Sequence, residues 1–328
     1  MKSSNHVAAF LVLLFCLSFV QGASGQGAEG FPERPVRLLV PYPPGGTADL
    51  LARIIAQKLS DKWGTTIVVD NRGGASGNIA TEMAARAEPD GYTVLLCNAP
   101  VLAINPALYK SVPFDPVKDF APINGIAEVP LFLVVHPALP VKTFEEFVLY
   151  VRNKKGDINY ASGSVGSTTH LAMELFKSMA KVELHHIPYK GSGPALAAIV
   201  AGQVPVMFEL MPSAMQFVKS DRLRAFAVTS AKRSPLMPEL PTIAEKGLPG
   251  YEVASWFGLC APRGTPRPVI NKVSENITAI LKTSDMQERF AGLGAQPMPM
   301  TPDKFGAFIK SEIGKWRKVV RDSNARVE

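Results

Sequence analysis

The stretch VPYPPGGTADLLARIIAQKL, residues 40–59, joins an apolar segment to a helical one through two prolines, two glycines and a threonine. Thr47 is the predicted N-cap of the helix, and Asp49 in the first turn suits the positive end of the helix dipole. Apolar side chains recur at helical spacing, which predicts one buried face; they are Leu50, Leu51, Ile54, Ile55 and Leu59. The stretch therefore predicts the strand, turn and helix of an α/β unit.

The same unit recurs along the chain, because apolar runs of strand length alternate with helical patterns. Thr143 and Glu146 form a capping-box pattern, and Thr301 before Pro302 predicts another helix start. Residues 100–122, rich in proline and aspartate, are predicted to have little regular structure. Strands are predicted at residues 36–40, 67–70, 93–97, 131–135, 182–187, 206–210, 223–229 and 253–260, with a short one ending at 160.

The N-terminal 25 residues have the layout of a secretory signal peptide. Lys2 supplies a positive charge, residues 8–20 form an uncharged apolar run, and small residues surround Ala23 and Gly25. This run is too short for a typical membrane span, and no other segment is apolar for long enough to cross a bilayer. We therefore expect residues 1–25 to be cleaved and the mature protein to be soluble and exported.

Composition limits the classes of partner. The remaining chain is large for one core and suits two lobes. The formal net charge of +7 is scattered along the sequence, which argues against nucleic-acid binding. Cys97 and Cys260 both lie in apolar strand-like runs and are expected to be small buried hydrophobes. An oxidising compartment would permit a disulfide between them, and the sequence leaves that question open.

Four turns that precede predicted helices share glycine and hydroxyl residues. Glycine lets the backbone approach a ligand, and the free amides of a first helical turn attract negative charge. The turns occupy residues 43–47, 73–78, 162–169 and 189–193. Lys190 is the only basic residue inside the three tightest turns, and Arg72 borders the second. We therefore expect an anionic ligand held mainly by peptide amides and hydroxyls.

Catalytic and metal-binding patterns are weak. Ser162 occupies the position where a nucleophile elbow needs its first glycine, and Ser164 has no assigned base. His170, beside the loop, fits either a ligand contact or a structural hydrogen bond. His185 and His186 are adjacent on a strand and point to opposite faces, which is wrong for one metal ion. We expect no catalytic residue, no metal site and no cofactor.

A set of longer motifs resembles the Bug family, the extracytoplasmic solute receptors of tripartite tricarboxylate transporters. The resemblance runs from about Pro35 to the C-terminus. It rests on YPPGGTADLLAR, VVDNRGGASGNIATE, AEPDGYT, INPALYKSVPFDPVKDFAPI, HIPYKGSGPAL, RAFAVTSAKRSPLMPELPTIAEKGLPGYE and WFGLCAPRGTP. It implies a two-lobed, type II-like periplasmic binding protein. Each lobe would be a mostly parallel sheet flanked by helices, and crossing strands would form the hinge.

The resemblance also implies lobe boundaries and ligand-binding residues. Lobe one would comprise residues 26–124 and 252–328, and lobe two residues 125–251. The positions that match the family's site are Tyr42, Pro44, Gly46, Thr47, Ser76, Gly77, Asn78, Ser162, Gly163, Ser167, Thr168, Thr169, His170, Tyr189, Lys190 and Glu209. Glu209 stands where the family often has aspartate, and Trp256 on the returning strand would face either the cleft or the core.

These implications lead to one main hypothesis and two rivals. The main hypothesis is a monomeric, non-enzymatic receptor that closes on a small carboxylate and delivers it to integral membrane permease subunits. The ligand would be a dicarboxylate, tricarboxylate, amino acid or aromatic acid. One rival is a periplasmic sensor that reports ligand occupancy to a membrane signalling partner. The other is an exported hydrolase that uses Ser164 or Ser167 as its nucleophile.

Overall fold

The computed structural model describes residues 29–322, so the predicted signal peptide, residues 1–25, lies outside the described residues. The strands are β1 (Val36–Val40), β2 (Ile67–Asn71), β3 (Thr93–Asn98), β4 (Phe120–Val135), β5 (Asn159–Ser162), β6 (His185–Pro188), β7 (Val206–Leu210), β8 (Arg224–Val228), β9 (Ala254–Pro262) and β10 (Gln296–Pro297).

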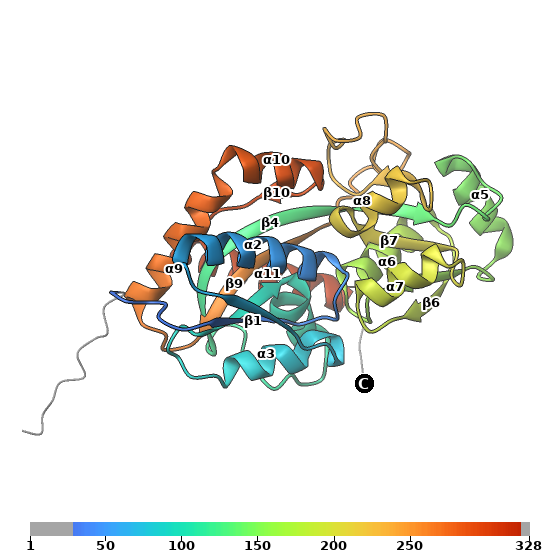
Figure 1. Ribbon diagram of the computed structural model, residues 1–328. Helices are drawn as coiled ribbons and strands as arrows, with labels where there is room; N and C mark the ends of the chain where they lie inside the picture. Colours follow the sequence, from blue (N-terminus) through green and yellow to red (C-terminus); the bar gives the residue numbers. More distant parts are fainter. Residues whose placement is uncertain (1–28, 323–328) are drawn as a thin grey trace, which may run out of the picture.

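Helices follow most of the strands, as the alternating pattern predicts (Figure 1). They are α2 (Thr47–Trp63), α3 (Asn78–Ala85), α4 (Asn105–Leu108), α5 (Phe144–Lys154), α6 (Thr168–Ala180), α7 (Ser192–Val200), α8 (Met211–Lys219), α9 (Arg267–Leu281), α10 (Ser284–Gly292) and α11 (Pro302–Asp322). A 3-10 turn, η2 (Ala75–Gly77), precedes α3, and a π-helical turn, η3 (Pro100–Ile104), precedes α4. No helix within residues 29–322 is both long and apolar enough to cross a membrane.

The long strand β4 connects the two halves of the molecule (Figure 1). Residues 120–130 pair antiparallel with β9 in a sheet of order β2-β1-β3-β9-β4. Residues 131–135 pair with β7 on one side and β8 on the other, and β5 and β6 extend that second sheet in parallel. We call the half built on β1, β2, β3 and β9 lobe one, and the half built on β5–β8 lobe two.

Helices cover both faces of each sheet, because successive strand residues point to opposite sides. In lobe one, Leu38 and Val40 pack toward α2 and α9, whereas Leu39 packs toward α3 and α11. In lobe two, Leu133 faces α5 and α6, whereas Val134 faces α7 and α8. This arrangement is an α/β fold with mixed sheets, parallel at the outer strands and antiparallel around β4.

The structure corrects the expectation for residues 100–122. Buried η3 and α4 follow β3 directly, and β4 begins at Phe120 rather than at residue 131. The proline-rich composition of residues 100–122 argues against a strand there, since proline cannot donate to the ladder. The β4–β9 register shifts just after Pro122, which accommodates that proline. The predicted lobe boundary at 124/125 falls within β4, and the predicted division into lobes remains a prediction.

The predicted helix starts give mixed results. Thr143 caps α5 by accepting a hydrogen bond from the Glu146 amide, as the capping box predicts. The prediction for Thr47 is wrong, because Gly46 is the N-cap of α2 and no side chain caps it. The Thr47 hydroxyl is used instead for a contact to lobe two, described below.

The two cysteines lie on the neighbouring strands β3 and β9. Cys97 and Cys260 are fully buried and free, and their Sγ atoms lie 2.7 Å apart. Burial and the neighbouring thiol raise the pKa of Cys97 well above its ordinary value. Both therefore act as apolar core residues, as expected from their strand contexts.

Gly258 is a point where β9 and α11 approach each other closely, and it offers a test of this packing. A Cβ atom there would overlap the Phe305 ring and lie 2.7 Å from the carbonyl oxygen of Asn124. We expect Gly258→Ala to lower the free energy of unfolding by about 1–3 kcal/mol. Urea unfolding measures this, with Gly292→Ala as the control because nothing lies within 4 Å of its new Cβ. Equal stability of the two variants would contradict the packing described for β9 and α11.

Candidate ligand-binding site

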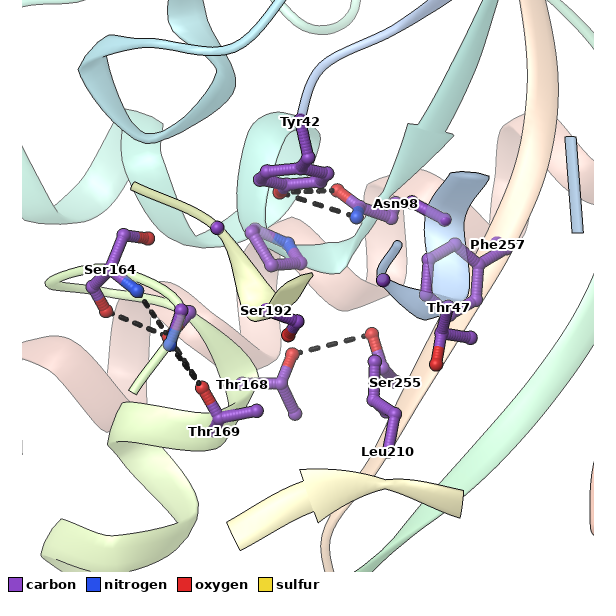
Figure 2. A pocket seen from close by; sticks show the side chains of 16 residues that line it. Tyr42, Thr47, Asn98, Ser164, Thr168, Thr169, Ser192, Leu210, Ser255 and Phe257 are labelled. Carbon is purple, nitrogen blue, oxygen red and sulfur yellow. Dashed lines mark hydrogen bonds between the residues drawn. The ribbon is translucent and has the colours of Figure 1, made fainter. Parts of the chain in front are cut away.

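A small cavity lies where loops from the two lobes meet (Figure 2). Most lining residues come from a helix start, a strand end or a loop between them, and Phe257 lies within β9. The lining residues are Tyr42, Gly46, Thr47, Ala48, Asn98, Pro100, Gly163, Ser164, Ser167, Thr168, Thr169, Gly191, Ser192, Leu210, Ser255 and Phe257. The carboxyl ends of strands in both sheets therefore border one site, as is typical of ligand sites in α/β folds.

The first turns of three helices contribute to the cavity wall. Gly46 and Gly191 are the N-caps of α2 and α7, and neither helix has a side-chain cap. Ser167 caps α6 by accepting a hydrogen bond from the backbone amide of His170. First-turn amides lack intrahelical partners and carry the positive end of the helix dipole. The cavity therefore has a positive electrostatic character that does not depend on charged side chains.

The lobe-two wall is a self-bonded loop that we call the serine loop, residues 162–167. The Gly163 amide donates to the Thr169 hydroxyl at 3.0 Å, and the Ser164 amide donates to the Ser167 hydroxyl at 3.3 Å. The Ser167 hydroxyl donates in turn to the Ser164 carbonyl at 2.7 Å. These bonds fix the directions in which the loop presents its hydroxyls.

The lobe-one wall includes a tyrosine and an amide that bond to each other. Tyr42 follows β1, Asn98 ends β3, and their side-chain polar atoms lie 3.3 Å apart (Figure 2). Burial raises the pKa of Tyr42, so the phenol keeps its proton at neutral pH and remains a hydrogen-bond donor. Phe257 supplies an apolar face beside them.

Two hydroxyl pairs and one loop contact connect the lobes at the cavity. The hydroxyls of Thr47 and Ser213 lie 2.9 Å apart, and the Thr168 hydroxyl donates to Ser255 at 3.3 Å (Figure 2). The Ser76 hydroxyl donates to the carbonyl of residue 165 at 3.2 Å. Glycines permit a still closer approach, since a Cβ on Gly193 of α7 would collide with the Pro44 carbonyl.

Seven of the predicted site residues line the cavity: Tyr42, Gly46, Thr47, Gly163, Ser167, Thr168 and Thr169. The other nine lie outside its lining: Pro44, Ser76, Gly77, Asn78, Ser162, His170, Tyr189, Lys190 and Glu209. The predicted residues of the turn at 73–78 form hydrogen bonds within the protein. For example, the side-chain oxygen of Asn78 accepts a hydrogen bond from the side-chain amide of Asn105. The Lys190 side chain is exposed at the start of α7. The ligand contacts of all sixteen residues remain predictions.

The cavity also contains residues that the motifs did not mark. Ser164, Ser192 and Gly191 belong to recognised loops at unrecognised positions, whereas Asn98, Ser255 and Phe257 come from strands. Ser255 and Phe257 line the cavity because alternate residues of β9 share a face. Trp256 lies on the opposite face, in the core, and its indole donates to Glu312 of α11 at 3.0 Å.

Glu209 is a fully buried carboxyl group behind the cavity. Its Oε1 accepts from Ser213 at 2.5 Å, and its Oε2 has no hydrogen-bond partner among the described residues. Burial raises its pKa to about 8, although the Ser213 and Ser192 hydroxyls act in the opposite direction. Glu209 is therefore protonated and neutral at pH 7, which leaves the rear of the cavity without a negative charge.

The rival enzymatic hypothesis gains no support from this geometry. The Ser167 hydroxyl bonds to Ser164 and Thr169 and to no base. Ser162 does contact a histidine, but its side chain is fully buried and does not line the cavity. Within residues 29–322, no group of three or more His, Cys, Asp or Glu side chains is placed to hold a metal ion.

The burial of Glu209 generates a pH prediction. A carboxyl whose pKa is higher in the folded than in the unfolded state stabilises the fold below the unfolded value, and that stability is lost as the pH rises through the folded value. Wild-type stability should therefore fall between about pH 5 and pH 8. Glu209→Gln keeps an acceptor for Ser213 without the ionisation, so its decline over this range should be shallower by up to about 1.4 kcal/mol per pH unit. Urea unfolding at several pH values measures the difference, and parallel curves would contradict a raised pKa.

Comparisons with known proteins place this chain in a family. The family model of the tripartite tricarboxylate transporter family receptor matches residues 51–325. The chain is 37% identical over 307 residues to protein BugT of Bordetella pertussis. The aligned residues make up 93% of this chain and 94% of BugT.

Three solved structures are similar throughout. R. palustris Rpa4515 with adipate has a TM-score of 0.88 and 39% identity, covering 90% of this chain and 98% of that one. The periplasmic binding protein BugD has a TM-score of 0.87 and 35% identity, with coverage of 91% and 100%. MatC from Rhodopseudomonas palustris with bound malate has a TM-score of 0.82 and 33% identity, with coverage of 88% and 100%.

The family model spans most of the chain, the BugT match extends over nearly all of it, and the similar structures share its two-lobed architecture. The chain therefore belongs to the tripartite tricarboxylate transporter receptor family of Bug proteins, which are substrate-binding receptors and not enzymes.

Proposed function

We propose that the cavity between the lobes binds a small carboxylate and that the receptor delivers it to integral membrane permease subunits. The observation that carries the proposal is the convergence of three helix N-termini and two lobes on one cavity. Amides and hydroxyls from both lobes would hold the carboxylate oxygens. Contacts to both lobes favour the closed form, so the ligand shifts the population toward closure.

The chemistry of the lining favours binding with ready release. None of the sixteen lining residues carries a formal charge at neutral pH. An anion bound here forms no buried ion pair, so its release leaves no opposite charge unpaired in the protein. The tyrosine, serine and threonine hydroxyls supply donors, and Leu210 and Phe257 can contact an apolar part of the ligand.

The similar structures support the ligand class and the place of action. Rpa4515 was solved with adipate and MatC with malate, two small carboxylates. BugD is a periplasmic binding protein, which supports a periplasmic location for this chain. We propose that residues 1–25 direct export, that the mature receptor is a monomer, and that occupancy serves transport rather than signalling.

A ligand panel tests the proposed function. Calorimetry of the mature protein with adipate, malate, citrate, glutamate and benzoate should detect one-to-one binding of at least one carboxylate. The matching amides or alcohols should bind weakly, because a neutral oxygen interacts less strongly with helix N-termini than a carboxylate does. Absence of binding across the whole panel would contradict the proposal. Co-purification with membrane subunits of a permease tests its delivery step.

Gly193 tests whether binding requires closure of the lobes. An alanine there would place its Cβ against the Pro44 carbonyl and within 3.4 Å of Gly45, so the closed form becomes strained. We expect Gly193→Ala to weaken carboxylate binding by at least about tenfold, equivalent to the 1–3 kcal/mol of an overpacked contact. In small-angle scattering with ligand present, the Gly193→Ala protein should have a larger radius of gyration than the wild-type protein.

The control for this variant is Gly314→Ala on α11, where nothing lies within 4 Å of the new Cβ. It should bind as wild type does. A Gly193→Ala protein with unchanged affinity and unchanged compaction would show that the two loops do not need to meet for the ligand to bind.

A further inference from the structure

Two histidines and a tyrosine form a stack next to the serine loop, outside the cavity lining. His170 on α6 and His186 on β6 have ring centroids 4.1 Å apart and ring planes 14° from parallel. Tyr160 on β5 continues the stack, with its centroid 4.8 Å from that of His186. The stack therefore connects three elements of lobe two at the base of the loop.

Both histidines bond to the serine loop. That loop supplies three cavity-lining residues, of which Figure 2 labels Ser164. The Nε2 atom of His186 lies 2.6 Å from the hydroxyl of Ser162. The backbone amide of Gly166 donates to Nδ1 of His170 at 3.2 Å. The first and fifth residues of the loop are thus each held by one imidazole.

The hydrogen-bond network assigns the protonation of one ring nitrogen, Nδ1 of His170. Ser162 has a single hydroxyl proton, which the Ser164 carbonyl at 3.1 Å or Nε2 of His186 at 2.6 Å can accept, so the His186 tautomer stays open. Because Nδ1 of His170 accepts from the Gly166 amide, that nitrogen has no proton. A proton added to Nδ1 would face a second donor, and the bond to Gly166 would be lost.

Few charges near the stack could compensate a protonated ring. Tyr160 on β5 and Glu174 and Lys177 on α6 are the titratable and charged groups that face the pair, and His185 acts on it only at longer range from the exposed side of β6. Glu174 Oε1 already accepts from the Tyr160 hydroxyl at 2.6 Å and from Lys177 at 2.8 Å. The one carboxylate of the group is therefore neutralised mainly by its lysine partner.

These surroundings keep both rings neutral. Burial is the largest cause that lowers the pKa of His170, and Lys177 adds to it while Glu174 opposes it. Burial also lowers the pKa of His186, to about 3, and repulsion from His170 is the next largest cause of that shift.

We propose that His170 and His186 are positioning residues that hold the serine loop in its ligand-binding arrangement, and that a proton on Nδ1 of His170 releases the loop and weakens ligand binding. This inference rests on the proposed function of the cavity. His170 has a lower pKa when the loop is ordered than when it is released, so the neutral ring favours the ordered loop at high pH. This contribution is lost as the pH falls below about 6.5 toward the shifted pKa.

The first test compares wild type with His170→Asn in titrations with adipate and malate between pH 8 and pH 4. Asparagine keeps an acceptor near the position of Nδ1 and cannot take up a proton. Wild type should lose affinity relative to His170→Asn by up to about tenfold per pH unit as the pH falls from about 6.5 toward the shifted pKa. The ratio of the two affinities at each pH removes the effect of protonation of the ligand itself. A ratio that does not change with pH would overturn the proposal.

Variants without the hydrogen bonds test the positioning role at pH 7. His170→Leu and His186→Phe should each weaken binding by about tenfold, whereas His170→Asn and His186→Gln should recover part of that loss. His185→Asn, on the exposed side of β6, is the matched control and should bind as wild type does. Thermal unfolding confirms that each variant is folded, and no recovery by the conservative variants would contradict the assigned bonds.

A second measurement needs no ligand. Hydrogen exchange of ligand-free protein should show that the peptide covering residues 162–170 loses protection between pH 7 and pH 5 in wild type, relative to His170→Asn. Equal loss in both proteins would overturn the proposal even if no panel carboxylate binds. If only wild type loses exchange protection and no carboxylate of the panel binds, the proposed ligand class is overturned. The role of the histidines in holding the loop is then still supported.

Discussion

The two lobes approach each other through backbone atoms, and this contact determines where a ligand can bind. Gly193 at the start of α7 packs against the Pro44 carbonyl and Gly45, with no side chain between them. Glycine is the only residue that leaves room for such an approach. Because the contact brings the N-termini of α2 and α7 together, the amides of both helices border one small cavity. A bulkier residue at this contact would separate the helix ends from a shared ligand.

The absence of charge in the cavity lining follows from the same geometry. A lysine or arginine side chain would fill much of so small a cavity, whereas first-turn amides occupy no extra volume. The neutral form of Glu209 belongs to this design, since an ionised carboxylate behind the wall would repel an anion. Tyr42, kept protonated by burial, adds a donor in place of a cation. The site thus attracts an anion with dipoles alone.

Local patterns in the sequence predicted the α/β units and the loops, since helical periodicity and glycine content depend only on neighbouring residues. Local patterns predicted poorly the features that depend on residues far apart in the sequence. Asn98 and Phe257 line the cavity because β3 and β9 happen to end or pass there, and no local motif marks them. The first half of β4 was missed because its prolines argue against a strand, yet its partner β9 lies more than a hundred residues away. The Thr47 hydroxyl does not cap α2 as predicted, and it contacts the Ser213 hydroxyl on α8 instead.

Under the proposed function, the lobes close through contacts that are individually weak. The hydroxyl pairs Thr47–Ser213 and Thr168–Ser255 each replace hydrogen bonds to water, so each contributes only about 1 kcal/mol. A few such contacts leave the open and closed forms close in free energy. A ligand that bonds to both lobes can then determine which form is populated. A ligand that binds the closed form about 5.5 kcal/mol more tightly than the open form raises the closed population from about 1% to about 99%. Stronger contacts between the lobes would close the protein without its ligand, and a receptor of that kind could not distinguish occupied from empty.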